Sequence, residues 1–434
     1  MTSESESRFF KEKKNSDPRT PAQTDRDRIL YSTAFARLAE VTQVVPSDRG
    51  HIFHNRLTHS LKVAQLARRL AEKLKQEQGS IADSIGGVCP DTAEAAALGH
   101  DLGHPPFGHA AETELDRLAR LAGCEDGFEG NAQSFRIATR LATGDGVADA
   151  EGNDAIEGLN LTRATLNGLL KYPWRHGGNP GNRKKWGAYE EDSEVFEWAR
   201  EHQLRPSRIK SAEAEIMDWA DDITFAVHDL FDFYRAGLVP LDRLVLQKPS
   251  EMDDFFRSAF ERSPKLAGDP RRAEAGFDGL CGHDLLAIVE PYQDTFARKT
   301  DIWRATTRLI TRFVNSIELR TPDEGDPRTV RIEPEAQFQV EVLKQITWRY
   351  VILRHDVNNE QAGQVRMIRA LFWHFHKASR SKDRWRFFPA SFREDLLQRA
   401  DGTDADRVRV VVDCVAGMTE VELARQYRLV SGIH

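Results

Sequence analysis

The chain has 434 residues, of which 40% are hydrophobic and 30% are charged, values that are typical of a soluble globular protein. The formal net charge of -7 argues against a protein that binds polyanions through its overall composition, so a nucleotide or nucleic-acid role needs a local basic patch. Four cysteines without a CxxC pair argue against a disulfide framework or a thiolate zinc site. Together with the lack of any apolar run near the roughly 18 residues that cross a bilayer, they predict a cytoplasmic protein with no membrane partner.

The first predicted element is a flexible N-terminal arm over residues 1–24, which are polar and charged. The alternative is an arm that becomes ordered against a neighbouring subunit. From Asp25 onward, apolar residues recur at helical spacing, and this predicted helix ends before Pro46. A loop is expected at 47–55.

The next predicted helix has a buried stripe from Leu57 to Leu74 at three- and four-residue steps. His59 lies in its first turn, away from the centre of the stripe. A single histidine in such a place is ordinarily a partly buried helix residue. A functional interpretation of His59 therefore depends on further ligands elsewhere in the chain. The stretch at 79–90 is predicted to be a loop.

The sequence HDLGHPPFGH, residues 100–109, contains three histidines and one aspartate. A short alanine-rich helix capped by Asp91 is expected to place His100 at its C-terminal end and Asp101 in the following turn. An imidazole and a carboxylate suit a borderline metal, although two ligands alone make a weak site. The two consecutive prolines prevent the helix from continuing and stiffen the next loop.

His109 begins another predicted helix, and Glu112 lies three residues further along the same face. A histidine beside a carboxylate is typical of a proton-transferring base and the group that orients it. The basic, glycine-rich loop at 175–187 has two interpretations, a solvated loop or a phosphate-attracting one.

A long helix is predicted over residues 211–235, with Asp218, Asp222 and Asp229 along a face next to its apolar stripe. Acidic side chains beside an apolar stripe are costly unless they are paired or bound to a cation. The alternative is a solvated acidic face.

The chain after residue 240 is again helical in pattern, with a polar break at 322–330 and at most a short strand at 329–332. No internal repeat or linker is evident. The sequence therefore predicts an all-α fold whose helical C-terminal half packs on a catalytic core. Its expected divisions are an arm (1–24), a core (25–240) and a C-terminal region of the same globular unit (241–434).

Four metal-competent side chains lie in or beside these predicted helices: His59, His100, Asp101 and Asp222. Two imidazoles and two carboxylates suit one divalent ion (Mn, Mg, Fe, Co, Ni or Zn), with positions left for water and a substrate oxygen. Such an ion can activate water, neutralise a phosphoryl oxygen and orient a leaving group.

Several motifs in the same order resemble the deoxyguanosinetriphosphate triphosphohydrolase-like (dNTPase) family of the HD-domain superfamily, over residues 18–235. The matching stretches are RTPAQTDRDRILYSTAFARL, TQVV, NRLTHSLKVAQLAR, LGHDLGHPPFGHAAE, FEGNAQSFRI, LKYPW, KKWGAYEEDSEVFEW and MDWADDITFAVHDL. The resemblance implies an HD-domain helical fold. It also implies hydrolysis of dGTP or several dNTPs to deoxynucleoside and inorganic triphosphate.

The resemblance further implies roles for individual residues. The implied metal ligands are His59, His100, Asp101 and Asp222, with Asp221 as the less favoured aspartate. The implied catalytic residues are His109, Glu112 and His104, the last near the α-phosphate. The predicted substrate-binding residues are Gln43 at the base or sugar, Arg56 at phosphate, and Asn131. Lys184, Lys185 and Arg163 are candidates for the triphosphate tail by charge alone.

Relatives in this family are commonly homo-oligomers, often hexamers, and some respond to a dNTP or single-stranded DNA effector, so the resemblance implies such partners. Phe225 stands where relatives often carry Tyr, and Ala36 where Arg is common, which affects the expected substrate preference more than the metal site. Two other functions stay open. One is a different HD phosphohydrolase, acting on nucleoside monophosphates or a guanosine polyphosphate. The other is a non-catalytic nucleotide- or nucleic-acid-binding regulator.

Overall fold

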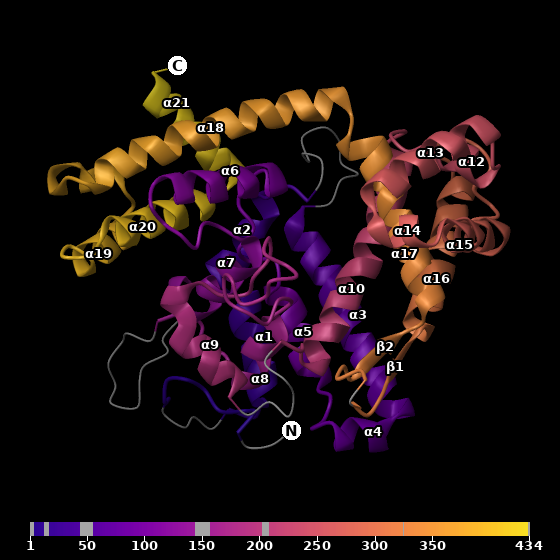
Figure 1. Ribbon diagram of the computed structural model, residues 1–434, viewed down its shortest axis with the longest axis horizontal. Helices are drawn as coiled ribbons and strands as arrows, with labels where there is room; N and C mark the ends of the chain where they lie inside the picture. Colours follow the sequence, from indigo (N-terminus) through magenta and orange to yellow (C-terminus); the bar gives the residue numbers. More distant parts are fainter. Residues whose placement is uncertain are drawn as a thin grey trace.

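The computed structural model describes residues 4–12, 17–43, 55–143, 157–201, 208–323 and 325–432 (Figure 1). Most of the loop predicted at 47–55 lies outside this described part. The prediction of an all-α fold is confirmed, since helices dominate every region and the described strands form one small sheet. No helix of the described residues combines the length and apolar character that crossing a membrane requires.

The N-terminal half consists of short and medium helices around a buried centre. Its α-helices are α1 (Pro21–Leu30), α2 (Thr33–Arg37), α3 (Arg56–Glu77), α4 (Gly79–Ser84), α5 (Pro90–Gly99), α6 (Gly108–Leu121), α7 (Gly130–Arg136), α8 (Arg163–Leu169), α9 (Ser193–Arg200) and α10 (Ala212–Thr224). Short helical turns are η1 (Leu38–Glu40), η3 (Ile137–Leu141) and η4 (Glu190–Asp192). The stretch predicted as a loop at 79–90 therefore contains a helix, α4.

Helix α5 lies at the centre of this half and packs against α1, α3, α8 and α10. Its sequence, PDTAEAAALG, is almost entirely buried, and its small side chains let the surrounding helices approach closely. A Cβ added at Gly168 of α8 would lie 3.0 Å from the Cβ of Ala96, which shows how near the two helices run. This close packing fixes the end of α5, where His100 follows.

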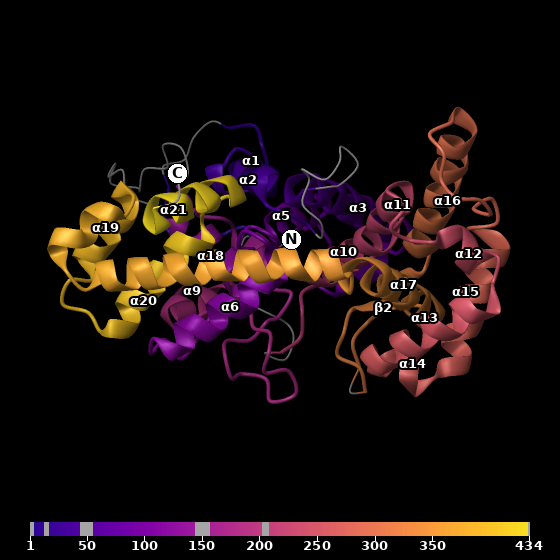
Figure 2. The same ribbon diagram turned by 90° about the horizontal axis from the view of Figure 1, so that it is seen from above.

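The C-terminal half flanks this centre on two sides. Its elements are η5 (Phe225–Asp229), α11 (Leu230–Arg235), α12 (Leu241–Val245), α13 (Pro249–Arg262), α14 (Pro264–Gly268), α15 (Pro270–His283), α16 (Phe296–Asn315), β1 (Ile317–Leu319), β2 (Val330–Ile332), α17 (Pro334–Thr347), η6 (Trp348–Ile352), α18 (His355–Ser379), η7 (Lys382–Phe387), α19 (Ala390–Gln398), α20 (Asp404–Ala416) and α21 (Glu420–Ser431). Helices α12–α17 lie at one end and α19–α21 at the other, while α18 crosses over α6 between them (Figure 2).

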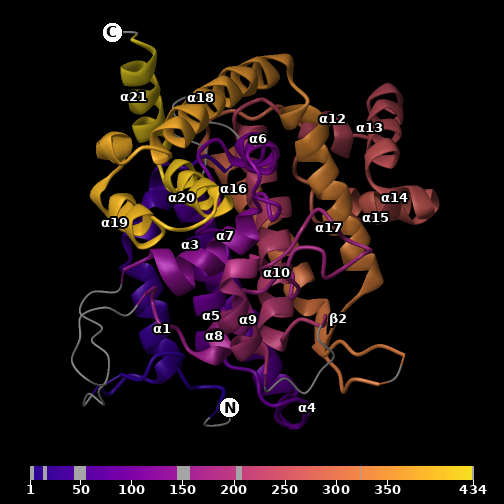
Figure 3. The ribbon, with the colours of Figure 1, turned by 60° about the vertical axis from the view of Figure 1, so that its left-hand side comes forward.

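The predicted helix at 211–235 is a continuous helical segment with a π-helical turn, η5, between α10 and α11. Such turns shift the faces of a helix and are frequent at functional sites. Figure 3 shows α17 alongside α10. The short strand expected at 329–332 is β2, which pairs antiparallel with β1 and sets Leu319 opposite Val330.

Buried apolar side chains form two large clusters. The first, here called the central cluster, joins α3, α5, α8 and α10 to α13, α15, α16 and α17. The second, the C-terminal cluster, joins α6 to α18 and α20. The central cluster includes Val239 and Leu241, so packing is continuous through residue 240, and the division predicted there stays a prediction.

Residues 4–12 of the predicted flexible arm contact the body of the chain, and the flexibility of the arm stays a prediction. Arg8 Nη1 lies 2.7 Å from Asp25 Oδ1, and the Arg28 guanidinium binds both oxygens of Glu12 at 2.7 and 2.9 Å. The Phe10 N–H also donates to the side chain of Asn160, at 3.1 Å. Because these partners lie in the same chain, this part of the arm lies on its own core.

Candidate metal and catalytic site

The turn after α5 places His100 and Asp101 at one point, because the helix ends at Gly99 and His100 caps it. His100 Nδ1 lies 2.6 Å from the carbonyl oxygen of Ala97, which can only accept a hydrogen bond. In the neutral ring Nδ1 therefore carries the hydrogen and Nε2 presents its lone pair. His100 Nε2 is buried, has no hydrogen-bond partner among the described residues, and lies 3.4 Å from Asp101 Oδ1. A buried atom left in this way suits a metal ion.

Gly103 is required in this turn by close packing against α7. A Cβ added there would lie 2.2 Å from the backbone nitrogen of Ser134, which no real side chain allows. The Ser134 hydroxyl donates to the carbonyl of His100 at 2.7 Å and accepts from the Gly103 N–H at 2.8 Å. One side chain thus ties both ends of the turn to α7.

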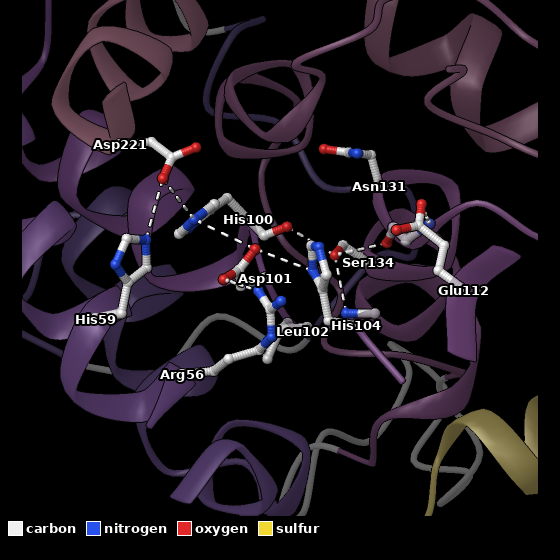
Figure 4. Close-up of polar contacts among 12 residues, drawn as sticks. Arg56, His59, His100, Asp101, Leu102, His104, Glu112, Asn131, Ser134 and Asp221 are labelled. Carbon is white, nitrogen blue, oxygen red and sulfur yellow. Dashed lines mark hydrogen bonds and ion pairs between the residues drawn. The ribbon is translucent and has the colours of Figure 1, made fainter. Parts of the chain in front are cut away.

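His59 of α3 is 1% exposed and points toward the same place (Figure 4). Its Nε2 lies 3.0 Å from Asp221 Oδ1, and its ring centre lies 5.8 Å from that of His100. Burial lowers the pKa of His59, which favours the neutral imidazole that a metal binds. Ligand atoms of His59, His100 and Asp101 all lie within 4.8 Å of one another.

The structure corrects the choice of aspartate on α10. Asp221, and not Asp222, lies beside the histidines, with Oδ1 3.0 Å from His59 Nε2 and 3.8 Å from His100 Nε2. Asp222 instead accepts a hydrogen bond from Lys344 of α17, at 2.9 Å. Adjacent helical residues point about 100° apart, so only one of the two can face the cluster.

Two cations neutralise these carboxylates. Arg56 Nη1 lies 2.7 Å from Asp101 Oδ2, and Lys171 Nζ lies 2.7 Å from Asp221 Oδ2. Burial opposes ionisation of Asp101, but its electrostatic interactions with His100, His104 and Arg56 hold its pKa well below the usual range. Sequence reasoning missed Lys171, although it lies in the LKYPW match.

The predicted pair of His109 and Glu112 forms at the start of α6. His109 Nδ1 lies 2.8 Å from Glu112 Oε2, and Lys185 Nζ lies 2.7 Å from Glu112 Oε1. Burial would raise the pKa of Glu112, but His109 and Lys185 hold it well below the usual range. The carboxylate therefore accepts a hydrogen bond from His109 Nδ1 and leaves Nε2 for another partner.

His104 lies between the two groups. Its Nδ1 is 3.0 Å from Asp101 Oδ1, and its ring centre is 5.8 Å from that of His109. Burial lowers the pKa of His104 to about 4. Figure 4 shows His59, His100 and Asp221 on one side of Asp101, and His104, Asn131 and Glu112 on the other.

The remaining predicted residues are divided between the site and other places. Asn131, on α7, donates to Glu129 Oε1 at 2.8 Å, next to Lys185. Gln43 Oε1 is buried without a hydrogen-bond partner among the described residues.

Arg163 lies away from the cluster, since its guanidinium stacks 4.5 Å over Trp198. Lys184 is exposed. Of the three basic candidates, only Lys185 contacts a predicted catalytic residue.

Comparison with known proteins agrees with this arrangement. Residues 56–143 match the HD domain, and residues 330–429 match the phosphohydrolase-associated domain. A deoxyguanosinetriphosphate triphosphohydrolase-like protein of Corynebacterium efficiens is 36% identical, covering 96% of this chain and 92% of that protein. Proteins of the same description from Streptomyces coelicolor (36% identical, 95% of this chain, 93% of that protein) and Bifidobacterium longum (32%, 96%, 84%) are also similar.

The helical fold and the histidine–aspartate turn after α5 define an HD-domain phosphohydrolase. Within that class, the chain belongs to the deoxyguanosinetriphosphate triphosphohydrolase-like family.

Proposed function

We propose that the protein hydrolyses deoxynucleoside triphosphates, dGTP or several dNTPs, to deoxynucleoside and inorganic triphosphate. The observation that carries the proposal is the joining of two chemical groups by His104: a buried histidine–aspartate cluster and the His109–Glu112 pair. The names of the similar proteins support the substrate class.

The cluster fits one divalent metal ion. His59, His100, Asp101 and Asp221 would hold it, since they offer two imidazoles and two carboxylates, and His100 Nε2 is buried without a partner among the described residues. An ion bound there would withdraw negative charge from the phosphate chain and neutralise developing charge. Its identity is open among Mn, Mg, Fe, Co, Ni and Zn.

Basic side chains around the cluster are suited to the triphosphate. Arg56 and Lys171 each lie 2.7 Å from a cluster carboxylate, and Lys185 lies 2.7 Å from Glu112. Each of these three cations therefore lies beside a carboxylate of the cluster or of the pair. Phosphate oxygens there would share them with the carboxylates, which draws charge from the α-phosphorus.

His109 supplies the proton transfer. Glu112 accepts from Nδ1 and orients the ring, so Nε2 is the exchanging atom. That nitrogen can take a proton from the attacking water or give one to the departing 5′-oxygen, and the anionic Glu112 stabilises the charged imidazole in either step.

A product assay tests the reaction. Purified protein is incubated with each dNTP, singly and in mixtures, with Mn²⁺ or Mg²⁺, and phosphates are separated by ion chromatography. We expect deoxynucleoside and inorganic triphosphate in equal amounts. Release of pyrophosphate or monophosphate would overturn the reaction. Deoxynucleoside and guanosine mono- and polyphosphates in the same panel test the other HD phosphohydrolase activities.

We further propose that the protein acts in the cytoplasm as a homo-oligomer. The sequence family supports this, and a hexamer with a dNTP or single-stranded DNA effector is the form to test. Light scattering with and without dNTPs or single-stranded DNA measures the assembly.

A further inference from the structure

The backbone just before His109 has an unusual conformation. Phe107 has φ 68° and Gly108 has φ 61°, and α6 begins at Gly108. Residues with a side chain seldom adopt a positive φ, and they keep it only where the surrounding structure imposes it. The direction in which α6 leaves the metal turn, and with it the place of His109, depends on what holds Phe107.

A hydrogen bond from the C-terminal part of the chain holds the backbone of Phe107. Its N–H donates to Glu420 Oε1 at 3.0 Å, across 313 positions of sequence. Its ring packs against the C-terminal cluster, which α18 and α20 build together with α6. Glu420 is the first residue of α21 and follows the capping residue Thr419.

The same carboxylate also holds the segment that leads to Gln43. The Thr42 N–H donates to Glu420 Oε1 at 2.8 Å, and the Thr42 hydroxyl donates to Oε2 at 2.8 Å. Hydrogen bonds to a charged acceptor are stronger than neutral ones, and three donors converge here on one group. Glu420 thus fixes two separate segments that lead into the site.

Arg37 makes a second connection, which joins the segment between α20 and α21 to the loop that follows Asp101. Its guanidinium donates to the carbonyls of Leu102 and His104, each at 2.8 Å, on the side of the site. On the other side it donates to the carbonyls of Ala416 and Met418 at 3.2 and 3.1 Å. Figure 1 shows α20 and α21 next to α6 and α2, where these contacts are made.

We infer that Glu420 is a positioning residue for the hydrolysis: it holds the Phe107–Gly108 turn and thereby sets the place of His109 relative to the metal cluster. This inference rests on the proposed function. None of the contacts described for Glu420 reaches His109 or the metal cluster. Its effect therefore passes through the backbone of two loops.

The first test compares Glu420→Ala with a matched control, Glu422→Ala. Glu422 lies in the same first turn of α21 and is exposed. It accepts a hydrogen bond from its own helix cap and interacts with Arg37 through its charge, but no described hydrogen bond joins it to Phe107 or Thr42. We expect kcat of E420A to fall on the order of tenfold or more, because small misplacements of reacting groups are costly. Its Mn²⁺ affinity should match that of wild type, and E422A should keep the wild-type kcat.

Glu420→Gln separates positioning from folding, since it retains a side-chain oxygen that can accept from Phe107 and Thr42. We expect E420Q to recover most of the kcat lost in E420A. If kcat of E420A equals that of E422A, or if kcat and Mn²⁺ affinity fall together in both E420A and E420Q, the inference is overturned.

Hydrogen exchange of the metal-free enzyme tests whether Glu420 holds the Phe107–Gly108 turn, and it requires no turnover. Peptides that cover residues 105–112 should exchange faster in E420A than in wild type and E422A, while peptides from α3 and α5 stay unchanged. Equal exchange of residues 105–112 in E420A and E422A would contradict the inference. Because this readout needs no substrate, it decides the role of Glu420 even if the dNTP assay rejects the proposed reaction.

Discussion

The metal cluster and the His109–Glu112 pair lie side by side but belong to different packing units. The residues of the metal cluster come from α3, α10 and the turn after α5, and these helices pack in the central apolar cluster. The His109–Glu112 pair lies at the start of α6, which packs with α18 and α20. The His59 and His100 side chains are 1% and 3% exposed, and that of His109 is 71% exposed. The two histidines proposed as ligands are thus buried, whereas the histidine proposed for proton transfer is exposed to solvent.

This difference assigns the C-terminal half a part in the proposed chemistry. The distance between the metal cluster and His109 depends on how the central cluster and the C-terminal cluster pack together. Pro105 and Pro106 stiffen the connecting loop, but Arg37 and Glu420 tie that loop to the end of α20 and the start of α21. The predicted rigid spacer therefore has outside supports that the local sequence does not reveal.

The largest expected effect is that of a substitution at His109, which should change kcat without changing the metal cluster. Replacing His109 by Ala should lower kcat by roughly 10²–10⁴-fold, the usual contribution of a positioned acid or base. Mn²⁺ affinity, measured by calorimetry, should stay at the wild-type value because His109 lies outside the cluster. An H109A enzyme with wild-type kcat would leave this residue without a catalytic role.

A second variant breaks the connection between the units. Asp413 of α20 is fully buried and lies 2.9 Å from the equally buried Arg136 of α7. Asp413→Ala leaves Arg136 with Asp192 and Glu191 as charged partners, but it removes the buried acceptor of Arg136 Nε and of the Gln133 side chain. Because buried donors left without an acceptor are costly, this variant should lower the free energy of unfolding by about 3 kcal/mol. Urea denaturation measures it, with Asp404→Ala, at the exposed start of α20, as the control. A D413A loss no larger than that of D404A would refute the link.

The smallest expected effect concerns pH. Burial lowers the pKa of His104 to about 4, below its ordinary value of 6.5. Between these values the unfolded chain binds a proton that the folded chain does not, so stability is complete above pH 6.5 and falls as the pH decreases toward 4. For the metal-free protein we expect a loss of about 2 kcal/mol between pH 7 and pH 5 from this residue. The slope of unfolding free energy against pH should flatten in His104→Gln, and an unchanged slope would contradict the assignment.

Sequence alone located the parts of the site that depend on local spacing. The His100–Asp101 turn follows from a helix end, and the His109–Glu112 pair follows from a three-residue step. Their proximity could be predicted because neighbours in sequence are there neighbours in space.

Other features depend on tertiary packing and could not be predicted in this way. The choice between Asp221 and Asp222 depends on the rotation of α10 against α3 and α17, since either aspartate borders the apolar stripe. Lys171 and Glu420 meet the site only after distant segments pack, so no local pattern marks them. The place of the arm at 4–12 likewise depends on a partner, Asp25, that lies beyond the arm itself.

The most direct test of the account is a Mn²⁺ titration of metal-free wild type, Asp221→Asn and Asp222→Asn by calorimetry. Loss of a ligand should weaken binding at least as much as loss of an outer partner, so D221N should bind at least about 10–100-fold more weakly than wild type. D222N should bind within about threefold of wild type, because Asp222 is paired with Lys344. Weak binding by D222N with wild-type binding by D221N would show that Asp222, and not Asp221, is the ligand. Wild-type binding by both variants would show that the cluster does not bind the metal.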